Sequence, residues 1–472
     1  MSTLHPHTRH VALLVAMVFF MQLLNSSMVL TSLPQIAEAF GVAPLDVSLG
    51  VAIYTIAMAT FVPFAGWLAD QIGARRVFGT AILIFCATSI ACGLSQSLTA
   101  FVVARALQGI ASAMITPVGR IVVLNKASKS ELLDATALVT WPALFAPVIG
   151  PVLGGAITTY ASWRWNFFIN VPIGLLALVI VPRLLSNDPP ATRRRFDIPG
   201  FLLIGGGLCG TLIGLQLFAT LDGDPLIATG VTLTGAALCA LAIRHFHRTP
   251  APLLGIGPFA TATFRHAAIH GGLAFRTITA AMPFLLPLYF QIAFGLSPVA
   301  AGSLILVYFL GNLGMKAVTS PLLRRFGFRT VLVLNGIVGS ASIAGCALLS
   351  PVTPSPLVMA VLLLAGLTRS MQFTALNTLA FADIGPEHRS AGATWMALLQ
   401  QVSMSMGIVI GTAVIETARL LHGGNQLSLA DFHLTFVVLA VVALVASLSF
   451  QRLSLTAGSD VSGHGVKAAP NA

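Results

Sequence analysis

Stretches of about 20 apolar residues recur along the whole chain, and short polar turns separate each stretch from the next. A run of this length crosses the hydrocarbon core of a bilayer as one helix. The pattern predicts fourteen transmembrane helices, at residues 11–33, 47–69, 77–97, 99–123, 135–159, 165–184, 199–219, 227–245, 267–290, 298–318, 329–349, 356–377, 391–415 and 433–451.

The composition excludes a soluble protein. Charged residues make up 8% and hydrophobic residues 56% of the 472 residues, whereas about a quarter of an ordinary soluble domain is charged. The first run is too long for a secretory signal peptide and lacks a small-residue cleavage site, so we expect it to remain as a helix. The five cysteines lie in apolar runs without the spacing of a metal site, and we interpret them as packing residues.

Basic residues gather on alternate turns between the predicted helices. The formal net charge of +11 does not indicate a nucleic-acid partner, because a soluble nucleic-acid-binding protein gathers such charge on one solvated face. With the N-terminus in the cytoplasm, only Arg164 and Arg419 fall in outside segments. Most of the 25 basic residues then fall in inside segments, including Arg75, Arg76, Lys126, Lys129, Arg193 to Arg195, Arg324, Arg325 and Lys467. The positive-inside rule therefore predicts that both termini are cytoplasmic.

Two pairs of segments repeat each other. The turn DQIGARRVF (70–78) returns as RRFGFRTVL (324–332), in which Gly327 matches Gly73 at an offset of 254 residues. A weaker R-x-x-Q repeat links 105–108 with 369–372. We therefore predict two related six-helix bundles, 11–184 and 267–451. A linker with two extra transmembrane helices, 185–266, separates them, and a disordered cytoplasmic tail, 452–472, follows.

The segment GWLADQIGARR (66–76) places a carboxylate, Asp70, at the cytoplasmic end of the second predicted helix. A carboxylate there can hold a helix N-terminus or a basic residue in one conformation and release it in another. The alternative is a solvated turn that only fixes orientation. The repetition of the turn in the second half favours the conformational role.

The fifth predicted helix carries APVIGPVLGG (146–155), which sets Ala146, Gly150 and Gly154 four residues apart. These small residues share one helix face and allow another helix to approach closely. Three prolines, Pro142, Pro147 and Pro151, bend the same helix. Such a helix suits a surface on which two bundles rock, and static close packing remains the alternative.

Together GWLADQIGARR, RALQGIASAMITP (105–117), APVIGPVLGG and WRWNFFINVPIG (163–174) resemble the signature set of the major facilitator superfamily. More narrowly, they resemble its fourteen-span drug:proton antiporter branch of the EmrB/QacA type. FMQLLNSSMVLTSLP (20–34), PVGRIVVL (117–124) and QFTALNTLAFADI (372–384) are most similar to the MdtD/HsrA-like group.

The resemblance implies an all-α integral membrane protein with the major facilitator fold, in which 14 transmembrane helices form two pseudo-symmetric six-helix bundles plus a central inserted helix pair. It also implies roles for two sets of residues. The conformational gating residues are Gly66, Asp70, Gly73, Arg75, Arg76, Ala146, Gly150, Pro151, Gly154 and Gly155, and the helix-4 motif contains Arg105, Gln108 and Gly109.

The sequence departs from the branch in its first helix. Where the branch commonly carries an acidic residue, this chain has Asn25. An aspartate at that depth can exchange a proton for a cationic substrate, but asparagine cannot titrate. Gln22, Asn25 and Ser26 are nevertheless expected near one helix face that points at a substrate cavity or at a neighbouring helix. Interhelical hydrogen bonding alone is the alternative.

Arg105, Arg276 and Arg369 lie inside predicted helices with no acidic residue at comparable depth. By superfamily resemblance their helices line a central cavity, together with Gln108 and Gln372. We therefore expect a positive cavity that favours anionic or amphipathic cargo. The alternative is a structural role for each arginine, bonded to backbone carbonyls or polar neighbours. Asp134, His270 and Glu416 are the remaining candidates for proton coupling.

The resulting prediction is a secondary transporter that works by alternating access in a bacterial inner membrane, a multidrug-type exporter with proton coupling left open. An uncoupled facilitator or exchanger of anionic small molecules is the first alternative. A non-transporting membrane sensor with the same fold is the second. The sequence contains no H-E-x-x-H, G-x-S-x-G or phosphate-binding loop, so we expect no enzyme, no metal and no cofactor. The expected partners are a small molecule and the lipid bilayer, and the expected state is a monomer.

Overall fold

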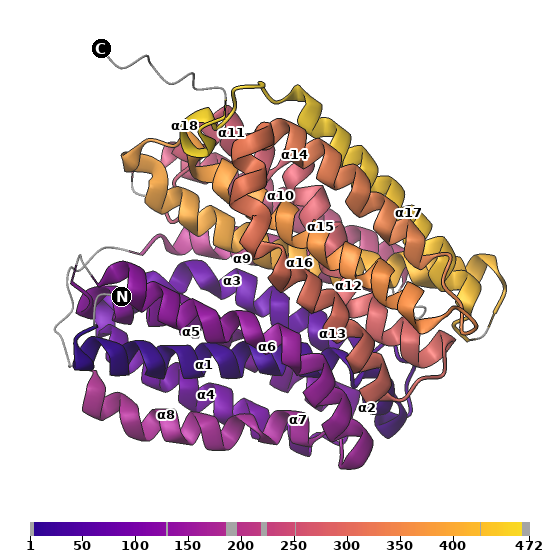
Figure 1. Cartoon of the computed structure of the whole chain (residues 1–472). Coiled ribbons are helices and arrows are strands. Elements are labelled where there is room, and N and C mark those ends of the chain that lie inside the picture. The colour runs from indigo at the N-terminus through magenta and orange to yellow at the C-terminus, as the bar shows by residue number, and fades with distance from the viewer. Residues whose placement is uncertain are drawn as a thin grey trace. The chain divides into compact units, whose positions relative to one another are not determined.

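A computed structural model describes residues 4–128, 131–185, 196–218, 224–250, 252–424 and 426–464 (Figure 1). Throughout these ranges the regular secondary structure is helical. The chain divides into two compact units, Met1–Leu253 with Gly295–Ser303, and Leu254–Phe294 with Leu304–Ala472.

The first unit begins with a long helix that is buried along most of its length. Its helices are α1 (Pro6–Leu30), α2 (Leu33–Phe40), α3 (Ser48–Ile72), α4 (Ala74–Leu94), α5 (Leu98–Lys126), α6 (Leu132–Tyr160), α7 (Trp165–Phe168), α8 (Asn170–Leu184), α9 (Ile198–Phe218) and α10 (Pro225–Arg248). The start of α13 (Pro298–Gly314) also belongs to this unit.

The second unit contains the remainder of α13 and the later helices. These are η1 (Gly257–Ala260), α11 (Ala262–Ala268), α12 (His270–Leu288), the π-helical turn η2 (Tyr289–Ala293), α14 (Lys316–Cys346), α15 (Ser355–Ala382), η3 (Pro386–His388), α16 (Arg389–Leu421), α17 (Leu429–Leu448), η4 (Ser449–Arg452) and α18 (Ser459–Ser462).

Within the described ranges, thirteen helices are long and apolar enough to cross a membrane, and α13 is a shorter apolar helix. Only a helix or a closed barrel can satisfy every backbone N–H and C=O group inside hydrocarbon, which explains why apolar runs of this length fold as helices. The prediction of an all-helical, multi-span protein is confirmed, and the expected count of fourteen is consistent with thirteen long helices plus α13.

Two local features differ from the predicted boundaries. Residues 33–40 form a separate helix, α2, which ends at Gly41 in a left-handed conformation (φ 67°). The predicted helix 298–318 ends earlier, at Gly314, and α14 begins at Lys316 and continues through a sharp break at Gly327. A short amphipathic helix and a kink both escape a search for long apolar runs.

An apolar core in the first unit joins α1, α3, α4, α5, α6 and α8. Val15 and Phe19 of α1, Phe85 of α4 and Ile115 of α5 are buried in it. Figure 1 shows α1, α5 and α6 running alongside one another. This core fixes which faces of the helices are turned toward the polar groups of the interior.

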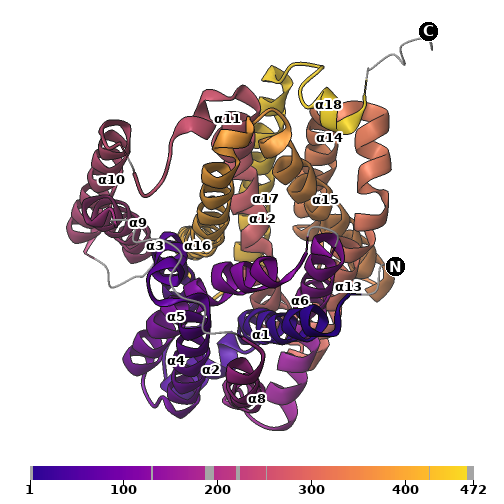
Figure 2. The ribbon, with the colours of Figure 1, turned by 90° about the vertical axis from the view of Figure 1, so that its left-hand side faces the viewer.

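The helices predicted as an inserted pair, α9 and α10, pack tightly on each other (Figure 2). Glycines make this possible, since a methyl group on Gly235 would collide with the backbone of Thr211. The helix α9 also contacts α3, where Gln216 Nε2 donates to Ser48 Oγ at 3.1 Å. Both helices group with the first unit.

A carboxylate ties both ends of this hairpin to the chain that follows it. Asp197 accepts hydrogen bonds from Gly200 N (2.9 Å), Leu253 N (3.0 Å) and His245 Nε2 (2.7 Å). Partial burial disfavours its charged form, but these hydrogen bonds outweigh burial and lower the pKa of the Asp197 carboxyl. Asp197 therefore stabilises the junction in its ionised form.

Several predicted basic turn residues, Lys129, Arg193 to Arg195 and Lys467, lie outside the described residues. Part of the tail that was expected to be disordered is described, up to residue 464. It contains α18, which packs on α14.

The two repeated turns share one backbone conformation. Gly73 has φ 91° and ψ 136°, and Gly327 has φ 72° and ψ 166°. Only glycine adopts this region without strain. We therefore predict that Gly73→Ala lowers the free energy of unfolding by about 1–3 kcal/mol, measured as thermal unfolding of purified protein. Gly79→Ala is the control, because a methyl group there meets only Val181 Cγ1 at 3.7 Å. Equal effects of the two substitutions would show that the turn carries no backbone strain.

Asp197 predicts a pH-dependent contribution to stability. A lowered folded-state pKa means that its contribution is complete above the unfolded value of about 3.9 and is lost as pH falls through the folded value. We expect Asp197→Asn to lower the melting temperature at pH 7, and the difference from the native protein to shrink below about pH 4. Asp224→Asn serves as control, since asparagine also caps the start of α10. A difference that persists unchanged at low pH would contradict this assignment.

Candidate functional site

The polar face of α1 points into the first unit. Gln22 Nε2 donates to the Ser112 carbonyl oxygen at 3.3 Å, and Thr116 Oγ1 donates to Gln22 Oε1 at 3.1 Å. The side chain of Gln22 therefore bridges α1 and α5. Ser26 is half-buried on the same helix.

Asn25 is completely buried and bonded on both sides. Its Nδ2 donates to Gln108 Oε1 at 3.5 Å, and its Oδ1 accepts from Asn170 Nδ2 at 2.9 Å. An amide can both donate and accept in this way, whereas an ionised carboxylate can only accept. The position that the branch commonly fills with an acid is thus used here as a neutral link between α1, α5 and α8.

Arg105 has an exposed fraction of 0%. Its Nη1 donates to Gln108 Oε1 at 2.6 Å and its Nε to the Gly50 carbonyl oxygen at 3.2 Å. The guanidinium lies over the ring of Tyr54, with Cζ 4.1 Å from the centroid. Within the described chain no carboxylate pairs with Arg105, and neutral oxygens and an aromatic face surround its charge.

Gln108 completes the network. Its Nε2 donates to Ser89 Oγ at 2.8 Å, and the Tyr54 hydroxyl donates to Ser112 Oγ at 2.9 Å. The sequence pattern singles out Gln108 but not Tyr54, Ser89 and Asn170. The only sequence signal for Ser89 and Asn170 is that each is a polar residue inside an apolar run. Such residues are common in these helices.

In the second unit, Arg276 extends from α12 between α15 and α16 with an exposed fraction of 4%. Its Nη1 donates to Gln400 Oε1 at 3.2 Å and its Nη2 to Asn377 Oδ1 at 3.2 Å. Its Cζ lies 5.5 Å from the centroid of the half-exposed Phe373 ring, and Lys316 Nζ lies 5.7 Å from the same centroid. Two cations thus lie close to one aromatic ring.

Arg369 lies one turn before Phe373 on α15. Its Cζ is 5.6 Å from the centroid of the Tyr308 ring. Gln372, which follows it in the R-x-x-Q motif, is fully buried and bonded elsewhere. Its Oε1 accepts from Asn335 Nδ2 at 2.8 Å and its Nε2 donates to the Leu332 carbonyl oxygen at 3.1 Å.

These contacts extend the internal repeat. Tyr54 and Tyr308 are separated by 254 residues, the offset that relates Gly73 to Gly327. In both units an arginine of the R-x-x-Q motif lies over the tyrosine, and the glutamine binds the helix that follows the repeated turn. The offset of 254 residues can be read from the two glycines in the sequence. Once the structure shows that Arg105 stacks on Tyr54, this offset identifies Tyr308 as the matching tyrosine.

The small residues of α6 contact two different segments. A methyl group on Gly150 would collide with Ser27, and one on Gly154 would lie 2.8 Å from the Met28 backbone, so this face packs on α1. Ala146 is buried on the same face. Gly155 and Pro151 instead lie against residues 298–302 at the start of α13, which belong to the same unit.

The turn after α3 joins that helix to α4. Asp70 is exposed near the C-terminal end of α3, and among the described residues it forms no ion pair. Gly66 lies one turn earlier, with open space where a side chain would stand. Arg75 and Arg76 begin α4.

The three titratable candidates have different surroundings. Glu416 forms an ion pair with Arg419, with Oε1 2.6 Å from Nη2. His270 lies next to His266, with ring centroids 4.7 Å apart at the break between α11 and α12. Asp134 is half-buried in the first turn of α6. No cluster of three or more potential metal ligands occurs among the residues the structure describes.

Comparison with known proteins supports this architecture. The family model described as Major Facilitator Superfamily matches residues 15–408. Over 462 residues the chain is 34% identical to the "Putative multidrug resistance protein MdtD" of Salmonella paratyphi B, and the alignment covers 96% of each chain. The protein of the same name from Salmonella typhimurium matches to the same extent.

Solved structures with the same fold are transporters. The POT family transporter PepTSo has a TM-score of 0.70 at 12% identity, covering 98% of this chain and 99% of that one. A bacterial homologue of the human lysosomal transporter Spinster, inward-facing and unoccupied, has a TM-score of 0.67 at 13% identity and covers 99% of this chain and 100% of that one. Since the family model spans most of the sequence and the MdtD proteins match it over nearly their whole length, the chain belongs to the major facilitator superfamily.

Proposed function

We propose that this chain is an exporter of the multidrug type that moves small molecules by alternating access. Membership of a transporter superfamily and similarity to proteins named for multidrug resistance support the proposal. The observation that carries the choice of cargo is the group of buried arginines whose partners are neutral.

The cargo we propose is anionic or amphipathic. Arg276 donates to two amide oxygens, and Lys316 Nζ lies 5.7 Å from the centroid of the Phe373 ring that Arg276 also contacts. In a low-dielectric interior an uncompensated cation attracts an anion far more strongly than it does in water. A partly exposed aromatic ring close to two cations suits a molecule with an acidic group and an apolar body.

Proton coupling through helix α1 is not part of the proposal. Asn25 has no titratable group, and its amide hydrogen bonds occupy the place where a carboxylate would exchange protons. Glu416, His270 and Asp134 stay candidates for an antiport mechanism. Of these, Glu416 would have to leave its ion pair with Arg419 in order to take up a proton.

An uncoupled facilitator or exchanger of anionic molecules is the second candidate, and Asn25 is the observation that favours it. We also infer a monomer in a bacterial inner membrane with both termini in the cytoplasm. The distribution of basic residues along the sequence supports that orientation.

Transport and coupling are tested in proteoliposomes that contain the full chain. We expect substrate flux in a screen of anionic and amphipathic compounds, measured with and without an imposed pH gradient. Flux that follows the gradient would support antiport, whereas flux that ignores it would support the facilitator. Absence of flux for every compound would contradict transport of this cargo class.

Asp70→Asn tests the proposed gating turn. We expect it to reduce the initial rate about five- to tenfold with little loss of folded protein, because the variant removes a charge that distinguishes two conformations. Glu38→Gln is the control, since Glu38 is also exposed but lies outside the repeated turn. Unchanged transport by Asp70→Asn would leave the turn with a topological role alone.

Arg276→Gln tests the charge of the cargo. Loss of a charge-assisted contact should weaken binding of an anionic substrate about tenfold or more and leave a cationic analogue nearly unaffected. The matched control is Arg164→Gln, because Arg164 also donates to a neutral oxygen, the Ser95 carbonyl, and also lies over an aromatic ring, Trp163. Equal weakening of anionic and cationic compounds would remove the argument for anionic cargo.

A further inference from the structure

Four basic side chains gather in the second unit where the helix α12 begins, and we call them the basic cluster. Arg265 and His266 lie in the last turn of α11, and His270 is the first residue of α12. The imidazole rings of His266 and His270 have their centroids 4.7 Å apart. The charges of Arg265 and of the fourth member, Arg452, also act on His266, so the four groups share one neighbourhood. Figure 2 shows α11 at one end of the helices of this unit.

The packing of η4 on the start of α12 brings Arg452 to this place. A methyl group on Gly271 would collide with Ser449 and with the Ala446 carbonyl oxygen, so the two backbones approach closely. Arg452 is the last residue of η4 and is exposed. A guanidinium from a distant part of the sequence therefore stands beside the break between α11 and α12.

The basic cluster has no counter-charge among the residues that the structure describes. In that part of the chain no carboxylate forms an ion pair with Arg265, Arg452 or either histidine. Arg265 uses its Nη1 for the carbonyl oxygens of Phe259 and Ala260, both at 2.8 Å, which leaves its other guanidinium donors for a ligand. Like charges that are held close together repel each other, so an anion bound among them is stabilising.

The basic cluster lies at the level where the phosphate groups of a bilayer are expected. The helix α12 has 19 residues, and at 1.5 Å per residue its length is about 28 Å, close to the roughly 30 Å of a hydrocarbon core. A helix of this length that spans the core has its first residue, here His270, in a headgroup layer. The neighbouring Ile269 side chain is 46% exposed. An exposed apolar side chain among cations suits a ligand with both a negative group and a hydrocarbon chain.

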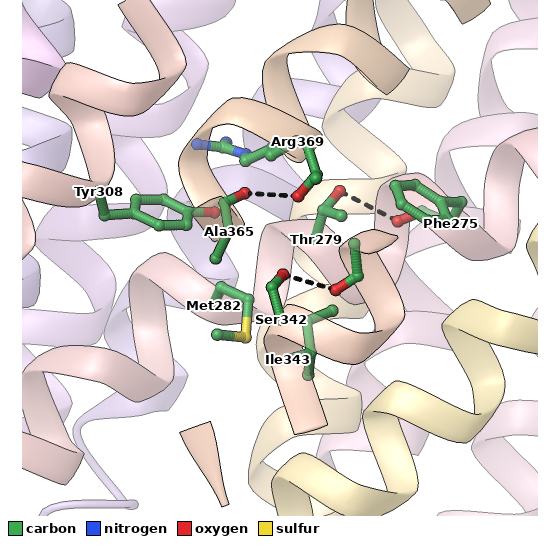
Figure 3. Close-up of a pocket in the computed structure, with 10 residues that line it drawn as sticks. Phe275, Thr279, Met282, Tyr308, Ser342, Ile343, Ala365 and Arg369 are labelled. Carbon is green, nitrogen blue, oxygen red and sulfur yellow. Dashed lines mark hydrogen bonds between the residues drawn. The ribbon is translucent and has the colours of Figure 1, made fainter. Parts of the chain in front are cut away.

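The interior of the same unit offers no comparable place. The small pocket between α12, α13, α14 and α15 has room for about one water molecule (Figure 3). Phe275 and Met282 are among the side chains that line it, and Arg369 and Tyr308 are hydrogen-bonded to each other. At the break between α11 and α12, by contrast, both arginines and His270 are exposed.

We propose that the basic cluster binds the phosphate group of an anionic phospholipid. The guanidinium groups of Arg265 and Arg452 contact the phosphate, and the His270 ring adds a hydrogen bond. Ile269 contacts the start of an acyl chain. Basic pockets between transmembrane helices recognise lipid headgroups in this way. The site is separate from the proposed cargo contacts of Arg276, which is 4% exposed and bonded to side chains of α15 and α16.

The test is thermal unfolding of the purified full chain in dodecyl maltoside micelles that contain increasing fractions of dioleoylphosphatidylglycerol. Dioleoylphosphatidylcholine is the reference, because it has the same acyl chains and no net charge. We expect the anionic lipid to raise the melting temperature to a plateau about 3–5 °C above the reference. Since neither cargo nor flux is involved, failure of this test leaves the proposed transport function untouched.

Two variants assign the effect to the basic cluster. Arg265→Gln and Arg452→Gln should each reduce the difference between the two lipids by at least half, whatever they do to the melting temperature without lipid. Arg183→Gln is the matched control, because Arg183 is also exposed near a helix end and its Nη1 donates to the Val179 carbonyl oxygen at 2.8 Å. The control should keep the full difference.

A further pair of measurements distinguishes a lipid from free phosphate. Replacing sodium gluconate by sodium phosphate at constant ionic strength should leave the melting temperature unchanged. Ile269→Ser should reduce the effect of the anionic lipid, because it removes the apolar contact while the charges remain.

Any of three results would overturn the proposal. One is an equal melting temperature in the two lipids. Another is a lipid difference that persists in the double variant of Arg265 and Arg452, which would locate the lipid elsewhere. The last is an equal stabilisation by inorganic phosphate, which would identify the ligand as a free anion.

Discussion

The structure depends on satisfying buried polar groups without help from water. Arg105 is the extreme case, because it is completely enclosed. Among the described residues, oxygens of Gly50 and Gln108 and the face of Tyr54 surround its charge, while its Nη2 has no hydrogen-bond partner. A buried cation costs several kcal/mol unless such contacts replace its hydration. The helices α3, α4, α5, α1 and α8 must therefore meet at one point in one register. Gln108 holds that point together, since it accepts from Arg105 and Asn25 and donates to Ser89.

Close helix contact is what allows this register. Gly109 sits where a side chain would collide with the Tyr54 carbonyl oxygen, and Gly150 where it would collide with Ser27. With little hydrophobic driving force between helices in lipid, small residues and interhelical hydrogen bonds provide the association energy. Asn166 forms interhelical hydrogen bonds of the same kind just beyond the end of α1. Its Nδ2 donates to Ser32 Oγ at 2.7 Å and to Thr158 Oγ1 at 3.0 Å. One amide thereby links three segments.

The two units share one constellation of residues but bond it differently. An arginine over a tyrosine, with a glutamine three residues later, occurs in each, but the glutamine turns toward the arginine in the first unit and away from it in the second. The first arrangement is a closed network. In the second, Arg276 and Lys316 lie close to the Phe373 ring.

The sequence by itself determined the helical spans, the positions of the strained turns and the family. Hydropathy is a property of about twenty consecutive residues. The need for glycine at 73 and at 327 comes from the backbone dihedral angles of those single residues. Both signals are therefore local. It also marked Asn25, Arg105 and Gln108 as polar exceptions. Only the tertiary structure decided their partners, the grouping of α9 and α10, and the pairing of Glu416 with Arg419. A buried polar side chain needs a hydrogen-bond partner. Which helix provides that partner depends on where the helices cross and on the rotation of each helix about its axis, and no local stretch of sequence determines either.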